Sequence, residues 1–198
     1  MNQRTTRLLL EMLLIVILST ILSMVQTDLL IKDYYILIVC LLFPLLWITF
    51  RYGASTGVVT ATLSGFVIGI LKVKRLDIIA IVIQSILPLL SVGFAGLFAK
   101  YTQKTLNNKR YSSTYLNLTT GTFFTVLLYF LAQYLINQFV YSQTVFEYKG
   151  WSLVINVILN TVLWSALLCI IAKSQPKWII PKRSRFLSRK ETTSLLND

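Results

Sequence analysis

Long apolar runs separated by short polar segments dominate the chain. Six runs have the roughly 17 to 25 residues that a helix needs to cross a bilayer: residues 8–25, 34–50, 54–71, 78–98, 118–140 and 153–172. Backbone polar groups find no water partners in lipid, so all six are expected to be helices. The pattern therefore predicts an all-α, polytopic membrane protein with one six-helix domain over residues 1–175 and a basic tail over 176–198.

The positions of the charged residues predict the orientation of these spans. Only 13% of the residues are charged, and the 19 basic residues outnumber the 7 acidic ones. Under the predicted topology, 14 basic residues fall on the side of both termini, and the others are Lys32, Lys72, Lys74, Arg75 and Lys149. Cytoplasmic loops carry the Lys and Arg excess, so both termini are expected in the cytoplasm of a bacterial cell. The basic residues flank apolar segments and form no folded basic face, so nucleic acid is not an expected partner.

The residue types present disfavour an enzyme. Histidine is absent, so neither a Ser-His-Asp triad nor a histidine metal site can be built. Cys40 and Cys169 both lie inside apolar runs, where small buried hydrophobes are expected. No general base stands beside a nucleophile within a span. We expect no catalytic residues, no metal and no cofactor.

Polar amides inside the spans mark the best candidate site, because such residues are costly in lipid and face protein or a cavity. Five fall at one depth in the outer halves of the fourth to sixth spans: Gln84, Gln133, Asn137, Asn156 and Asn160. Tyr141, Glu147 and Trp151 are expected in or beside the loop over them. Two interpretations stand at this point: a pocket for a small ligand, or hydrogen bonds that join the helices to one another.

Small residues mark candidate packing surfaces. In the third span Gly57 and Gly65 belong to a stripe of small residues with four-residue spacing, and Ser19 and Ser23 form a weaker one in the first span. Such stripes let helices approach closely, either within the chain or against another membrane protein.

Several sequence pieces, in order along the chain, resemble the substrate-binding S components of energy-coupling factor transporters, and among them the thiamine-specific branch. The pieces are residues 10–12 (Leu-Glu-Met), 18–23 (Leu-Ser-Thr-Ile-Leu-Ser), 50–54 (Phe-Arg-Tyr-Gly-Ala), 92–98 (Val-Gly-Phe-Ala-Gly-Leu-Phe) and 149–151 (Lys-Gly-Trp), followed by Asn156 and Asn160. The resemblance implies a vitamin ligand captured from outside, between the first loop and spans four to six. It also implies three partners, namely a transmembrane coupling protein and two cytoplasmic ATPase subunits.

The resemblance also implies site residues and a difference in ligand chemistry. It adds the aromatic Tyr34 or Tyr35 to the expected ligand contacts. Where the thiamine branch carries a carboxylate for its cationic ligand, this chain has Gln84, and the fifth-span histidine is missing. The expected ligand is therefore thiamine or a related small heterocycle. The alternative is a membrane protein without a transport role, in which the amides are packing contacts.

Overall fold

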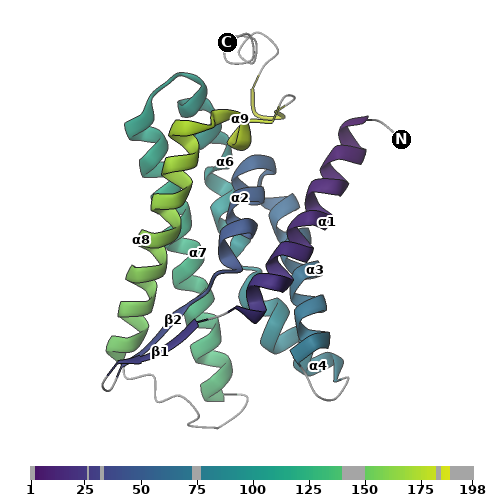
Figure 1. The fold of residues 1–198 in the computed structure, drawn as a ribbon, viewed down its shortest axis with the longest axis vertical. Helices are drawn as coiled ribbons and strands as arrows, with labels where there is room; N and C mark the ends of the chain where they lie inside the picture. Colours follow the sequence, from purple (N-terminus) through teal and green to yellow (C-terminus); the bar gives the residue numbers. More distant parts are fainter. Residues whose placement is uncertain are drawn as a thin grey trace.

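Helices make up most of the computed structural model, which describes residues 3–25, 27–31, 34–72, 77–139, 150–181 and 184–187 (Figure 1). Long helices are α1 (Gln3–Met24), α3 (Ala54–Lys72), α7 (Tyr111–Phe139) and α8 (Gly150–Ser174). The fourth predicted span is interrupted and consists of α4 (Ile78–Ile81), the π-helix η1 (Val82–Ile86), α5 (Leu87–Leu89) and α6 (Val92–Asn107). Five helical segments of the described residues are long and apolar enough to cross a membrane. The predicted helical membrane fold is confirmed.

The second predicted span differs from the expectation. Residues 34–50 are not one helix: they begin with β2 (Tyr34–Ile38), which pairs antiparallel with β1 (Thr27–Ile31), and continue into α2 (Leu42–Tyr52). Helix α2 has 11 residues, a length of about 16 Å, whereas the hydrocarbon core is about 30 Å thick. The prediction of a continuous span over residues 34–50 is therefore wrong.

Local sequence explains where this segment divides. Its first part is rich in aromatic and β-branched residues, including Tyr34, Tyr35, Ile36 and Ile38, which favour strands. Pro44 lies in the first turn of α2, where a missing N–H costs no helical hydrogen bond. A run of apolar residues has the same hydropathy in either conformation, so hydropathy alone did not separate strand from helix.

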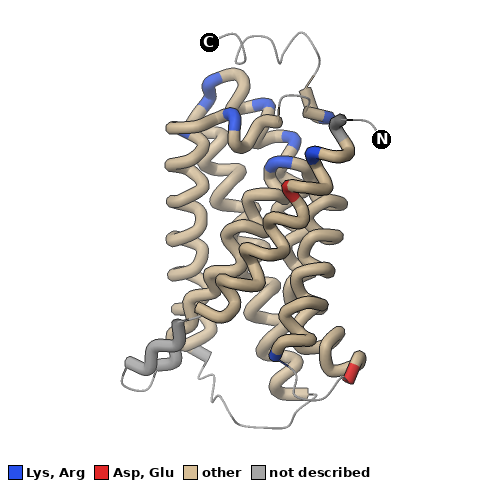
Figure 2. Tube along the Cα trace, turned by 45° about the vertical axis from the view of Figure 1, so that its right-hand side comes forward, with Lys and Arg blue, Asp and Glu red and all other residues tan. Residues whose placement is uncertain are grey.

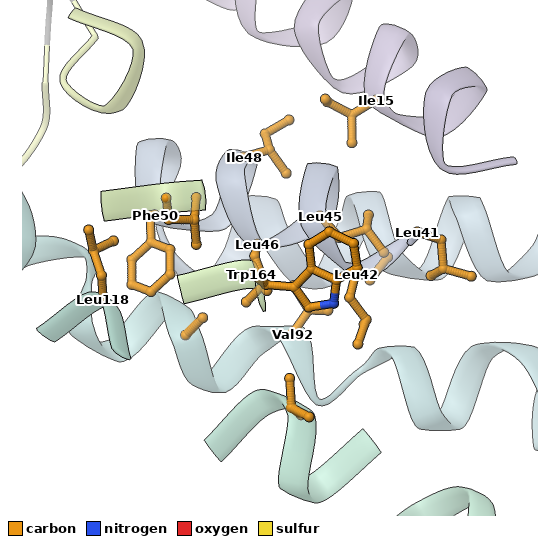
Figure 3. Packing of buried hydrophobic residues seen from close by; sticks show 14 of the residues in the cluster. Ile15, Leu41, Leu42, Leu45, Leu46, Ile48, Phe50, Val92, Leu118 and Trp164 are labelled. Atoms are coloured by element: carbon orange, nitrogen blue, oxygen red, sulfur yellow. The ribbon is translucent and has the colours of Figure 1, made fainter. Parts of the chain in front are cut away.

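Helix α2 lies at the centre of the hydrophobic core. Leu42, Leu45, Leu46, Ile48 and Phe50 are fully buried. Their surroundings include Ile15 of α1, Val92 of α6, Leu118 of α7 and Trp164 of α8 (Figure 3). A helix that is apolar on all sides is expected inside the protein, and the longer helices surround this one.

The two ends of the bundle differ in charge. At one end, the α9 end, α1 begins and the short helix α9 (Pro176–Ile179) lies; at the other, the hairpin end, lie β1, β2 and α4 (Figure 1). Basic residues gather at the α9 end, and fewer coloured positions are charged at the hairpin end (Figure 2). Lys72 is the last residue of α3, and Asp77 caps the start of α4. Ile179 and Ile180 join the core, so residues directly after 175 pack as part of the same unit.

Candidate functional site

Two asparagines of α8 hold the strand β2 against the bundle. The backbone N–H of Leu37 donates to Asn156 Oδ1 at 2.8 Å, and that of Val39 donates to Asn160 Oδ1 at 2.9 Å. Asn160 Nδ2 in turn donates to the Leu37 carbonyl at 2.7 Å. Strand β1 occupies one edge of β2, so these side chains supply hydrogen-bond partners at the other edge.

Asn160 uses its full hydrogen-bonding capacity within the protein. Besides the bonds to Leu37 of β2 and to Val39 directly after it, its Nδ2 donates to the Asn156 carbonyl at 2.9 Å and its Oδ1 accepts from Trp164 Nε1 at 3.2 Å. A side-chain amide has two donor hydrogens and two acceptor sites, and all four are engaged. Both asparagines are fully buried. Of the two interpretations of the amides, hydrogen bonding between elements describes these two residues.

Gln84 lies in a widened helical turn directly before a proline. In η1 the N–H of Leu87 donates to the carbonyl of Val82, five residues earlier. Pro88 has no N–H, so the Gln84 carbonyl lacks the partner that a regular α-helix would give it. Single π-turns of this kind are frequent at functional sites. The Gln84 side chain is half-buried.

Glycines of α3 bring η1 close to its neighbour. A Cβ atom at Gly65 would lie 2.9 Å from both Ile86 Cα and the Ser85 carbonyl oxygen. A Cβ at Gly69 would meet Ile81 and Ser85. Nothing larger than hydrogen fits at Gly65 without moving the backbone beside Gln84. This part of the small-residue stripe therefore helps to place Gln84.

The remaining predicted ligand residues are distributed over the same end of the bundle. Gln133 and Asn137 are half-buried in the last part of α7, and α7 packs against both α8 and η1. The topology thus places Gln84, Gln133 and Asn156 on three neighbouring elements. Trp151, in the first turn of α8, is 72% exposed.

The other predicted aromatic and acidic residues are less defined. Tyr34 and Tyr35 are in β2, opposite Ile31 and Leu30. Tyr141 and Glu147 lie outside the described residues.

The four positions predicted for partner binding are buried within the chain. Ser19 and Ser23 of α1 are 0% and 2% exposed. Gly57 and Gly65 are buried too, and a Cβ at Gly57 would collide with the Thr49 side chain of α2. Close packing inside the chain, one of the two interpretations of the stripes, is what the structure displays at these positions.

A charged network at the α9 end joins Glu11, Arg51 and Tyr52, and the sequence pattern did not predict it. Arg51 is 5% exposed, and its Nε donates to Glu11 Oε2 at 2.9 Å. Arg51 Nη1 donates to the carbonyls of Lys177 and Trp178 in α9. The Tyr52 hydroxyl also donates to Glu11, at 2.8 Å. This network fastens α1 and α9 to the end of α2.

Gln103 is a second buried polar residue, and it lies beyond the fourth predicted span, residues 78–98. Its Nε2 donates to the carbonyls of Phe50 and Arg51, both at 2.8 Å, and its Oε1 accepts from Ser184 at 2.6 Å. It stands in α6 between the buried Ala99 and Leu106. The helical spacing of residues 99, 102, 103 and 106 is the signal that could have identified it.

The chemistry of the hairpin end suits binding. Among the described residues, no group of three or more His, Cys, Asp or Glu side chains could hold a metal ion. Neutral amides both donate and accept hydrogen bonds. The half-buried Gln84 and Gln133 lie in η1 and α7, and neither of these two helices contains an acidic residue.

Comparison with known proteins places this fold. The solved structure of ThiT from Listeria monocytogenes matches with a TM-score of 0.71 and 18% sequence identity, over 91% of this chain and 100% of that one. At that identity the match establishes the fold. No curated protein matches the chain. The model of the thiamine transporter protein family matches residues 9–180, most of the length. The resemblance found in the sequence is thus confirmed, and the chain belongs to the thiamine transporter protein family.

Proposed function

We propose that this protein is the S component of an energy-coupling factor transporter, which captures thiamine or a related small heterocycle at the hairpin end. The observation that carries the proposal is the fastening of β2 to α8 by Asn156 and Asn160. It brings the loop between α1 and α2 over the end of the bundle where Gln84 and Gln133 lie half-buried. Membership of a transporter family supports binding over catalysis.

The proposed orientation puts the hairpin end outside the cell. The basic residues gather at the α9 end (Figure 2), and Lys and Arg are enriched in cytoplasmic loops. A ligand would then enter beside the hairpin, and the α9 end would face the cytoplasm. A transmembrane coupling protein and two ATPase subunits would supply the energy that this small chain has no means of its own to provide.

Ligand contacts are assigned to the amides that have capacity left. Asn160 has none, so we assign it the role of holding the wall of the site. Gln84 and Gln133 are the proposed ligand contacts, and the other contacts predicted from the sequence, Trp151, Tyr141, Glu147, Tyr34 and Tyr35, stay predictions. A cation in a dry site needs a counter-charge or aromatic faces, and an amide at position 84 supplies neither. Compared with a site that has a carboxylate at this position, the amide of Gln84 shifts the preference of the proposed site from the thiamine cation toward a neutral heterocycle.

Titration of the purified protein tests this preference. Thiamine is compared with an analogue in which a neutral five-membered ring replaces the thiazolium, and quenching of tryptophan fluorescence is measured. Gln84→Glu should strengthen thiamine binding by about tenfold, equivalent to about 1.4 kcal/mol, and should leave the analogue unchanged or weaker. Gln175→Glu, an exposed residue beside α9, is the matched control and should change neither affinity.

Two results would contradict parts of this proposal. Tight thiamine binding by the wild type, unchanged in Gln84→Glu, would overturn the assigned role of Gln84. If neither thiamine nor the neutral analogue bound, the alternative of a membrane protein without a transport role would be favoured. Single cysteines introduced near Lys104 and Tyr148 test the orientation, and external labelling near Lys104 would reverse it.

A further inference from the structure

A groove at the α9 end, on the opposite side of the membrane from the proposed vitamin site, carries an independent inference. It has a volume of about 580 Å³ and lies between α1, α2, the end of α8 and α9. We call it the α1 groove. Its walls are mainly apolar, with Leu14 and Leu18 of α1, Phe43 and Trp47 of α2, and Ile171 of α8.

Charged groups line the same groove. They are Arg7, Glu11, Arg51 and Lys177, three cations and one carboxylate, with a net formal charge of +2. Arg51 is occupied by Glu11 and by the carbonyls of α9. The Arg7 Nε donates a hydrogen bond to Glu11 Oε1 at 3.1 Å. Within the described part of the chain, the two terminal nitrogens of Arg7 and the Lys177 ammonium have no hydrogen-bond acceptor. Positive charge at this end of the groove is therefore in excess.

Aromatic residues indicate that this charged part lies near the surface of the bilayer. Trp178 is 55% exposed, and its ring lies 6.4 Å from that of Trp47. Tryptophan is enriched at the level of lipid headgroups, where its ring is in apolar surroundings and its N–H is near water. Lys177, next to Trp178, stands at the same level.

The dimensions of the groove suit one lipid chain. Along α1 the lining runs from Arg7 to Leu18, which is about 16 Å at the helical rise per residue. One leaflet contributes about half of the 30 Å hydrocarbon core, or about 15 Å. An extended acyl chain of one leaflet therefore matches the length of the groove along α1.

We propose that the α1 groove binds one anionic phospholipid. Its phosphate contacts Arg7 and Lys177, and one of its acyl chains lies along Leu14, Leu18 and Ile171. Glu11 holds Arg7 in place, and the net charge of +2 on the lining favours a headgroup with a net negative charge. The site goes beyond the proposed function, because it involves neither the vitamin nor the hairpin end.

Native mass spectrometry of the full chain in a non-ionic detergent tests the site, with dioleoyl phosphatidylglycerol or dioleoyl phosphatidylcholine added. The wild type should bind one phosphatidylglycerol molecule at least about tenfold more tightly than phosphatidylcholine. The double variant Arg7→Gln/Lys177→Gln should lose most of this preference. The matched control Lys100→Gln/Lys104→Gln removes two exposed cations of α6 outside the groove and should keep it.

A variant that keeps every charge provides a second test in case the double variant Arg7→Gln/Lys177→Gln does not fold. Leu14 is 60% exposed, so Leu14→Trp should fold and should fill the groove, weakening both lipids. Equal binding of the two lipids by the wild type would overturn the proposal, as would an equal loss in the control pair. If Leu14→Trp bound lipid as the wild type does but no longer copurified with the coupling protein, the groove would be a site for a protein helix. That result would also overturn the lipid proposal. None of these measurements depends on thiamine.

Discussion

The hairpin end and the α9 end fasten a short segment to the helical bundle by different chemistry. At the hairpin end, neutral amides of Asn156 and Asn160 bind the backbone of β2. At the α9 end, the Arg51 guanidinium binds backbone carbonyls of α9 and pairs with Glu11. Both solve the same problem, since backbone groups outside a long helix need partners in a membrane protein.

The difference follows from the surroundings. The Glu11 side chain is 20% exposed, so water near the bilayer surface reduces the cost of its charge, and Arg51 compensates it. Asn156 and Asn160 are fully buried, where an unpaired charge would be far more costly than an amide. The proposed functions follow the same contrast, with a neutral ligand at the hairpin end and an anionic lipid at the α9 end. Three substitutions test this contrast.

The largest effect is expected for Asn160→Leu. The substitution removes the partners of the Val39 N–H, the Leu37 carbonyl and Trp164 Nε1. A buried polar group left without a partner costs about 1 to 3 kcal/mol, so the unfolding free energy should fall by about 4 kcal/mol. Chemical denaturation in detergent measures it. Asn117→Leu, a half-buried asparagine of α7, is the control. Equal losses in the two variants would refute a special role for the fastening of β2.

A somewhat smaller effect is expected for Arg51→Met. The change leaves the carbonyls of Lys177 and Trp178 without their donor, while Glu11 keeps Arg7 and Tyr52. Loss of one partner of a buried ion pair costs about 3 to 5 kcal/mol. Because Glu11 keeps two partners, the unfolding free energy of Arg51→Met should fall by about 3 kcal/mol. Arg7→Gln is the matched control on the same carboxylate. The Arg7 side chain is 58% exposed, so its loss should cost about 0.5 kcal/mol or less.

That pair of variants also has a second readout. Protease cleavage after α9 should become faster in Arg51→Met, because the fastening of α9 is lost, and it should stay unchanged in Arg7→Gln. Equal destabilisation by both substitutions would mean that the carbonyl contacts of Arg51 contribute nothing.

The smallest stability effect is expected for Gly65→Ala. The added Cβ would press on the backbone of Ser85 and Ile86 at 2.9 Å, and overpacking of this kind costs about 1 to 3 kcal/mol. It should also shift η1 and weaken ligand binding through Gln84. Gly93→Ala meets the end of the Val58 side chain, which moves more readily than backbone. If Gly93→Ala lost as much ligand affinity as Gly65→Ala, the position of η1 would not be what controls ligand binding, and the prediction would be wrong.

The sequence by itself determined the helical membrane fold. Lengths of apolar runs predicted six spans, and five of them match long helical segments to within a few residues at most ends, because a bilayer imposes one length and one kind of hydrogen bonding. The placement of Gln84, Gln133, Asn156 and Asn160 toward one end also followed from the sequence, since position along a spanning helix sets depth. The small-residue stripe likewise predicted close packing at Gly57 and Gly65.

Only the tertiary structure decided what these residues contact. Local sequence favours a strand at residues 34–38, but only the fold brings Asn156 and Asn160, more than 100 positions away, to hydrogen-bond Leu37 and Val39. The same contacts use all of the Asn160 amide, so a residue that depth alone marked as a ligand contact holds the loop. Gln103 and Arg51 acquired structural roles in the same way, from carbonyls that other elements bring beside them. Periodicity reports which face of a helix is buried, and it carries no information on which distant backbone groups need a partner there.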